Sequence, residues 1–105
     1  MKNKMVPYRP IGILKTLLNS LGFEVSYYYE DLIFVGHNAF LLRMEEKGEE
    51  VSLLFNTESD VDKRDEIAQL FTTEAKKYDL VISCPGTYQM MPNEADGTIN
   101  LVFQE

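Results

Sequence analysis

The residues best suited to covalent chemistry are the single cysteine, Cys84, and the single histidine, His37. Cys84 opens the run Cys84-Pro85-Gly86, where a strand is expected to end in a turn. A thiol presented there can act as a nucleophile if an imidazole activates it. A cysteine at a strand end also packs as a small apolar side chain, and His37 lies in an expected hairpin turn, which favours a solvated ring. Two interpretations stay open: a small cysteine-dependent enzyme that uses Cys84, and a cysteine without a catalytic role.

The sequence contains no clear motif for binding a metal ion or a nucleotide. One histidine and one cysteine cannot complete a zinc site without carboxylates. Asp60-Val61-Asp62 followed by Asp65 and Glu66 faintly resembles a calcium loop, but this run lacks the glycine and the oxygen spacing of an EF-hand and falls inside a helical pattern. Glycines occur singly in expected turns, so a phosphate-binding loop is not indicated. We therefore predict no catalytic residues, no metal and no cofactor.

Aromatic and thioether side chains gather at two places that could contact a partner. Tyr27-Tyr28-Tyr29 lies in an expected strand, where Tyr28 points to the face opposite its two neighbours. Tyr88 and Met90-Met91-Pro92 precede the last loop, and flexible methionines suit an adaptable binding surface. Packing into the core is the alternative for both groups. The acidic tip Glu45–Glu50 could meet a basic partner or keep a turn soluble.

Charge and composition exclude several classes of partner. The chain has a formal net charge of −7, so phosphate backbones and anionic membrane surfaces should repel it. A lone cysteine permits no internal disulfide and fits a reducing compartment. The sequence has no signal-peptide-like or membrane-spanning apolar run. We expect a soluble, cytoplasmic protein of one domain, residues 1–105, with an irregular N-terminal segment over residues 1–8.

The hydrophobic pattern predicts an α+β fold. A first helix is expected over Pro10–Leu21, with an apolar stripe at 3/4 spacing and Gly22 as its left-handed stop. Short turns then separate four expected strands, 24–29, 32–35, 39–44 and 49–56, which favours an antiparallel meander. A second helix is expected from about Asp60 to Tyr78. Two or three further strands follow, at 80–84, 87–90 and 98–103, in the same sheet with the helices mainly on one face.

The expected strands are apolar on both faces, which requires a cover on each side of the sheet. Five or six strands at ~4.8 Å spacing make a sheet about 25 to 29 Å wide, whereas two helices of ~10 Å diameter cover about 20 Å. A large apolar patch should remain, and a second copy or a bound partner is the simplest cover. Phe34 and Leu54 are both candidates for that face, and an aspartate at whichever of the two lies on it is expected to weaken association.

The order helix, antiparallel strands, helix, strands in a small acidic chain resembles the type III secretion chaperone-like fold. The resemblance is carried by the helix Ile11–Leu21 ending at Gly22-Phe23, the meander Val25–Phe55 and the helix Asp60–Tyr78. It implies a small homodimer that binds an extended segment of a client protein. Four strands rather than three before the second helix, and a strand rather than a helix at the end, depart from that family's pattern.

These observations predict a protein-interaction module without enzymatic activity, forming a homodimer through an apolar sheet face or an edge strand, and holding a client peptide. A subunit of a hetero-complex is a further interpretation. The predicted partner-contact residues are Tyr28, Phe34, Leu54, Tyr88, Met90 and Met91.

Overall fold

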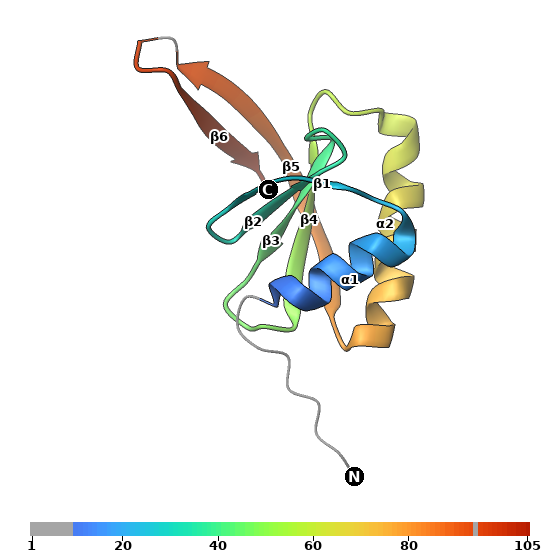
Figure 1. The fold of residues 1–105 in the computed structure, drawn as a ribbon. Coiled ribbons are helices and arrows are strands. Elements are labelled where there is room, and N and C mark those ends of the chain that lie inside the picture. The colour runs from blue at the N-terminus through green and yellow to red at the C-terminus, as the bar shows by residue number, and fades with distance from the viewer. Residues whose placement is uncertain (1–9, 94) are drawn as a thin grey trace.

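The computed structural model describes residues 10–93 and 95–105. The chain order is α1 (Ile11–Leu21), β1 (Val25–Tyr29), β2 (Leu32–Val35), β3 (Phe40–Met44), β4 (Glu50–Asn56), α2 (Val61–Ala75), the short 3₁₀ helix η1 (Lys76–Tyr78), β5 (Val81–Asn93) and β6 (Thr98–Gln104). The α+β class and the positions of the main elements are confirmed (Figure 1).

The first helix ends where the sequence predicts. Leu14, Leu17 and Leu18 are its buried residues, and they form one stripe against the sheet. Gly22 has a φ of 82°, in the left-handed region, and its N–H donates to the carbonyl of Asn19. Glycine adopts this conformation without a Cβ penalty, so the helix stops there.

The second helix is shorter than expected and less buried. The Asp60 side chain accepts a hydrogen bond from the Asp62 N–H at 3.0 Å and caps the start. The α-helix stops at Ala75 and continues as η1 to Tyr78. Phe71 and Ala75 are its buried residues, whereas Val61 and Leu70 are 67% and 42% exposed. This helix turns only part of its apolar stripe toward the core.

All six strands form one mixed sheet in the order β1-β2-β3-β4-β5-β6. The four-strand meander β1–β4 is antiparallel throughout. The next pair is not antiparallel: α2 carries the chain back across the sheet, so β5 lies parallel to β4. A connection that contains a helix permits this direction, whereas a short turn does not.

The last strands form a long hairpin, where the sequence predicted shorter strands and a break. A single strand of 13 residues, β5, runs through Cys84-Pro85-Gly86. Between Ser52 and Leu54 of β4 the register with β5 shifts, because one extra residue of β5 lies opposite β4. Such a bulge bends its strand and increases the local twist. From there β5 pairs with β6, and the hairpin projects beyond the other strands (Figure 1).

The two faces of the sheet bury two separate clusters. Both helices pack on the face that holds Ile33, Phe40, Leu42, Val51 and Leu53. The opposite cluster consists of Leu32, Phe34, Leu41, Leu54 and Tyr88, with Met90, Leu101 and Phe103 packed against it.

The expectation of a sheet face without intrachain cover is wrong for the second cluster, because the sheet curls. Phe34 on β2 and Tyr88 on β5 have ring centroids 6.0 Å apart, although three strand spacings of a flat sheet would separate them by about 14 Å. The β5–β6 hairpin therefore folds over the meander and covers the second cluster. The estimate from the sequence considered only the two helices as cover.

Candidate functional site

Three of the predicted partner-contact residues lie in the core of the single chain. Phe34 is 4% exposed, and Leu54 and Tyr88 are fully buried. The Tyr88 hydroxyl donates to the Asn38 carbonyl at 2.6 Å, and burial raises the pKa of Tyr88 to about 12. These side chains stabilise the second cluster and do not form an open contact surface.

Tyr28 does lie on the surface, together with its two neighbours. Tyr27, Tyr28 and Tyr29 are 61%, 41% and 52% exposed, so the alternative of core packing is wrong for them. Tyr27 lies opposite Phe34 and Tyr29 opposite Leu32, while Tyr28 lies opposite Ile33. The first two therefore share the face of the second cluster and Tyr28 the helix face, as the sequence predicts. We call Val25–Tyr29 the tyrosine edge.

The remaining two predicted residues lie on the hairpin. Met91 is 47% exposed and Met90 is half-buried against the second cluster. Register places Tyr88 with Phe103, Met90 with Leu101 and Pro92 with Ile99 on the same face. This apolar face is buried near the sheet and open toward the tip, where Ile99 is 57% exposed.

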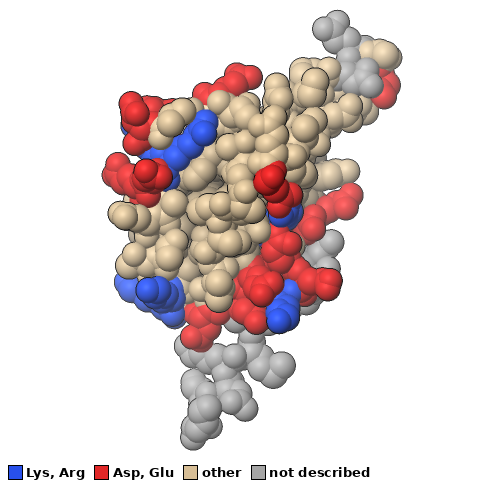
Figure 2. Space-filling model, turned by 180° about the vertical axis from the view of Figure 1, so that it is seen from behind, with Lys and Arg blue, Asp and Glu red and all other residues tan. Residues whose placement is uncertain are grey.

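The hairpin strands carry no charge. The strand sequences VISCPGTYQMMPN and TINLVFQ contain none of the 27 charged residues of the chain. Figure 2 shows the face behind α1: a broad surface without Lys, Arg, Asp or Glu continues onto the hairpin, and acidic and basic side chains lie around it. In a protein with a net charge of −7, this uncharged surface repels a second copy of the chain less than the acidic surface beside it does.

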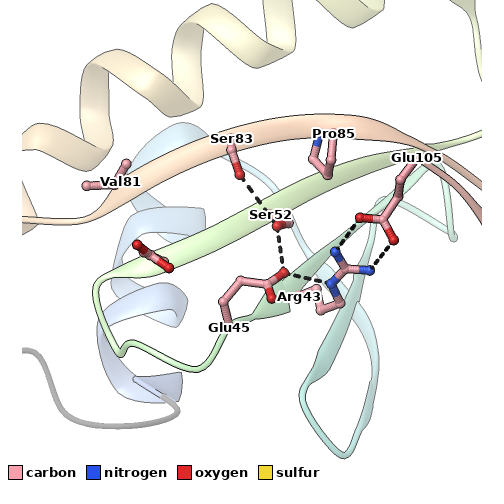
Figure 3. Close-up of a pocket in the computed structure, with 8 residues that line it drawn as sticks. Arg43, Glu45, Ser52, Val81, Ser83, Pro85 and Glu105 are labelled. Carbon is pink, nitrogen blue, oxygen red and sulfur yellow. Dashed lines mark hydrogen bonds and ion pairs between the residues drawn. The ribbon is translucent and has the colours of Figure 1, made fainter.

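A polar pocket of about 360 Å³ lies beside the start of β5, and Figure 3 shows its lining. At its centre the Arg43 guanidinium donates to Glu45 at 2.7 Å and to both carboxylate oxygens of Glu105 at 2.8 and 3.1 Å. The Ser52 hydroxyl donates to Glu45 at 2.6 Å and lies 3.5 Å from the Ser83 hydroxyl.

Hydrogen bonds between the charged groups of this pocket stabilise their ionised forms. The hydrogen bonds from Arg43 hold the pKa of Glu105 below its usual value of 4.5. Burial alone raises the pKa of Glu45, but the hydrogen bonds from Ser52 and Arg43 outweigh burial and leave it lowered. The guanidinium also lies 5.1 Å from the ring centroid of Phe103, within the range of a cation–π contact.

We interpret this group as a clamp that fixes the end of β6 to β3. Arg43, Glu45, Ser52 and Glu105 already use their polar groups in hydrogen bonds to one another. The clamp was not predicted from the sequence. The feature that could have indicated it is Arg43, a single cation within the otherwise apolar strand Phe40–Met44.

The cysteine lies in an environment that opposes a nucleophilic role. Cys84 sits at the bulge of β5 and is exposed, but desolvation by the surrounding atoms raises the pKa of its thiol, which lowers the thiolate fraction. His37 lies in the turn between β2 and β3, where its backbone N–H donates to the Ser26 hydroxyl at 2.7 Å. The two residues therefore belong to separate parts of the fold.

Neither a metal cluster nor a membrane helix is found in residues 10–93 and 95–105. No three His, Cys, Asp or Glu residues in these ranges are arranged to hold a metal ion. No helix there is long and apolar enough to cross a bilayer.

The fold defines the chain as a two-helix α+β domain with a curled mixed sheet. Comparison of the chain with protein-family models, with curated proteins and with solved structures gave no match. The resemblance to the type III secretion chaperone-like fold is not tested by these comparisons and stays a prediction.

Proposed function

We propose that this protein is a non-enzymatic protein-interaction module that self-associates into a homodimer through the outer edge of β6. One observation carries the proposal: β6 is an edge strand of seven residues without a charge. Among the described strands it pairs only with β5, so its outward backbone N–H and C=O groups are open to another strand.

Edge strands of monomeric proteins usually carry features that prevent such pairing. These include lysine or other charged side chains, proline, a bulge, or a very short strand. The sequence Thr98–Gln104 has no charged residue and no proline, and its register with β5 is continuous. An edge of this kind is a suitable template for strand addition.

A twofold pairing of two β6 strands would also bring the exposed apolar side chains of both hairpins together. Ile99, Val102 and Met91 are 57%, 38% and 47% exposed, and their burial is favourable in proportion to area. Most of the acidic surface would lie away from the contact, because the charges are outside the hairpin strands.

An extended segment of a client protein could add to the same edge in place of the second copy. This part of the proposal rests on the shared physics of strand addition and on the resemblance to secretion chaperones. A reducing, cytoplasmic setting is consistent with the single free cysteine. The raised pKa of the Cys84 thiol favours a binding role over the cysteine-dependent enzyme.

The test is the solution mass of the full chain, measured by light scattering over a range of concentrations. We expect a dimer, and we expect the double variant Ile99→Glu/Val102→Glu to be monomeric. Both side chains are exposed, so the substitutions should leave the fold intact, while they place like charges across the contact.

The matched control is Val61→Glu/Leu70→Glu. These two residues of α2 are 67% and 42% exposed, and the control makes the same change of charge away from the hairpin. It should remain dimeric. A wild-type chain that is monomeric at millimolar concentration would refute self-association, and an aggregate rescued only by co-expression with another protein would favour the hetero-complex instead.

A further inference from the structure

The side chains of β6 alternate between the two faces of the hairpin. Ile99, Leu101 and Phe103 point to the face of the second cluster, and the residues between them point to the opposite face. Leu101 and Phe103 pack against that cluster, whereas Ile99 is 57% exposed. The apolar layer of a single molecule therefore lacks cover at Ile99, toward the tip of the hairpin.

A second copy of β6 can pair antiparallel with this edge in only a few registers. Residues directly opposite each other in such a pair point to the same face of the sheet, and a slip by one residue turns every side chain to the other face. A twofold axis perpendicular to the sheet keeps the corresponding faces of both copies on the same side, so the axis must pass through a residue that lies opposite itself. The candidates near the middle of the strand are Asn100, Leu101 and Val102.

An axis at Leu101 gives the largest contact. It pairs all seven residues of Thr98–Gln104 with the same strand of the second copy. Opposite residues then have numbers that sum to 202. An axis at Asn100 or Val102 makes that sum 200 or 204, which pairs only five of the seven residues and leaves two in each strand without a strand partner. Unpaired residues lose the ladder hydrogen bonds, so the full overlap is favoured.

The register centred on Leu101 also supplies the cover that Ile99 lacks. It places Ile99 directly opposite the partner's Phe103, and the twofold axis makes this contact twice. A β-branched side chain opposite an aromatic ring is a favourable cross-strand pair. The apolar layers of the two hairpins then form one continuous layer across the contact.

The acids at the two ends of β6 are already held by groups of their own molecule. In this register Glu105 lies opposite the partner's Gly97 and next to the partner's Asp96. The Asp96 carboxylate accepts hydrogen bonds from the N–H and the hydroxyl of Thr98 at 3.1 and 2.7 Å. The Glu105 carboxylate accepts from the Arg43 guanidinium at 2.8 and 3.1 Å. The charge of Arg43 offsets that of Glu105, which reduces repulsion where the ends of the two strands meet.

We propose that a second copy of the chain pairs antiparallel with β6 about a twofold axis at Leu101, so that the partner's Phe103 covers Ile99 and the second clusters of the two molecules join. This inference rests on the proposed homodimer and adds its register. The apolar layer behind the hairpin is complete only when the second copy is present.

The experiment is a disulfide scan of the full chain in a Cys84→Ser background, with Asn100→Cys, Leu101→Cys or Val102→Cys added one at a time. Residues opposite each other in an antiparallel pair have Cα atoms about 4.5 to 5.5 Å apart, within the range of a disulfide. Only the residue on the axis faces its own copy, and the equivalent atoms one residue away from the axis are about 8 Å apart. We therefore expect a cross-linked dimer with Leu101→Cys and its loss with the other two variants.

A mixture of two variants tests the same register at exposed positions, which keeps the test independent of any effect of Leu101→Cys on the core. Thr98→Cys and Gln104→Cys chains, each with Cys84→Ser, should form a mixed disulfide when combined and none when oxidised separately. Both residues are exposed, so the fold should be retained. Thr73→Cys, at an exposed residue of α2, is the matched control and should give only the collisional background.

The outcomes separate the register from the dimer itself. A cross-link at Asn100→Cys or Val102→Cys in place of Leu101→Cys would overturn the register and leave the β6 contact standing. Equal cross-linking at all positions, Thr73→Cys included, would overturn it too. A dimer by light scattering that cross-links at none of the β6 positions would overturn both the register and the β6 contact. A chain that is monomeric at every concentration would refute the proposed homodimer, and the register with it.

Discussion

The substitution Gly86→Ala tests the curled sheet most directly. A Cβ at Gly86 would overlap the carbonyl oxygen of Gln104 and lie 2.9 Å from both the Gln104 carbonyl carbon and the Glu105 Cα. These are backbone atoms of the end of β6, so they cannot move aside as a flexible side chain does. Because carbon atoms in contact prefer about 3.5 to 4.0 Å, the end of β6 must shift by roughly an ångström.

The expected cost follows from that shift. Overpacking of a fitted site costs about 1 to 3 kcal/mol, and the loss of one backbone hydrogen bond at the end of β6 adds about 1 kcal/mol. We therefore expect the free energy of unfolding to fall by about 2 to 4 kcal/mol. The displaced hairpin should also uncover part of the second cluster and increase the binding of a hydrophobic dye.

Chemical denaturation measures this loss, and Gly12→Ala is the matched control. A Cβ at Gly12 meets nothing within 4 Å and sits in α1, so alanine there should leave stability unchanged or raise it by up to about 1 kcal/mol. If Gly86→Ala unfolds at the same denaturant concentration as the wild type, β6 does not press on Gly86, and the curled arrangement of the hairpin is incorrect.

Four further outcomes are expected. Leu54→Ala should lower the free energy of unfolding by about 2 to 5 kcal/mol, because the side chain is fully buried in the second cluster; an unchanged denaturation midpoint would contradict that burial. The pKa of Glu105 lies below its usual 4.5, so its bond to Arg43 stabilises the fold above pH 4.5 and is lost as the pH falls through the lowered pKa. Acid titration of stability should accordingly be shallower in Arg43→Gln than in the wild type. Asp60→Ala should cost about 1 kcal/mol as the N-cap of α2 is lost, measured by thermal unfolding. Cys84→Ser should change stability by less than about 0.5 kcal/mol because the residue is exposed, and the solution mass should stay the same.

The sequence alone determined the local structure. The 3/4 spacing of leucines and Gly22 placed α1, and short apolar runs with turn residues between them placed β1 to β4. These signals act over a few residues, through backbone sterics and side-chain periodicity, so they can be read without knowing what lies nearby. The opposite orientation of Tyr28 relative to its neighbours followed from the same alternation.

The tertiary structure decided which apolar surfaces are covered. Phe34 and Leu54 meet Tyr88 and Phe103 only because a bulge bends β5 and the hairpin folds back over the sheet. Beside the bulge, Gly86 lies so close to the backbone of Gln104, 18 positions later in sequence, that a Cβ there would overlap its carbonyl oxygen. The pairing of Arg43 with Glu105 likewise joins groups 62 residues apart. The hydrophobic pattern of a sequence indicates how much apolar surface must be buried. How a sheet curls and closes depends on contacts between distant segments. Those contacts exist only in the folded chain.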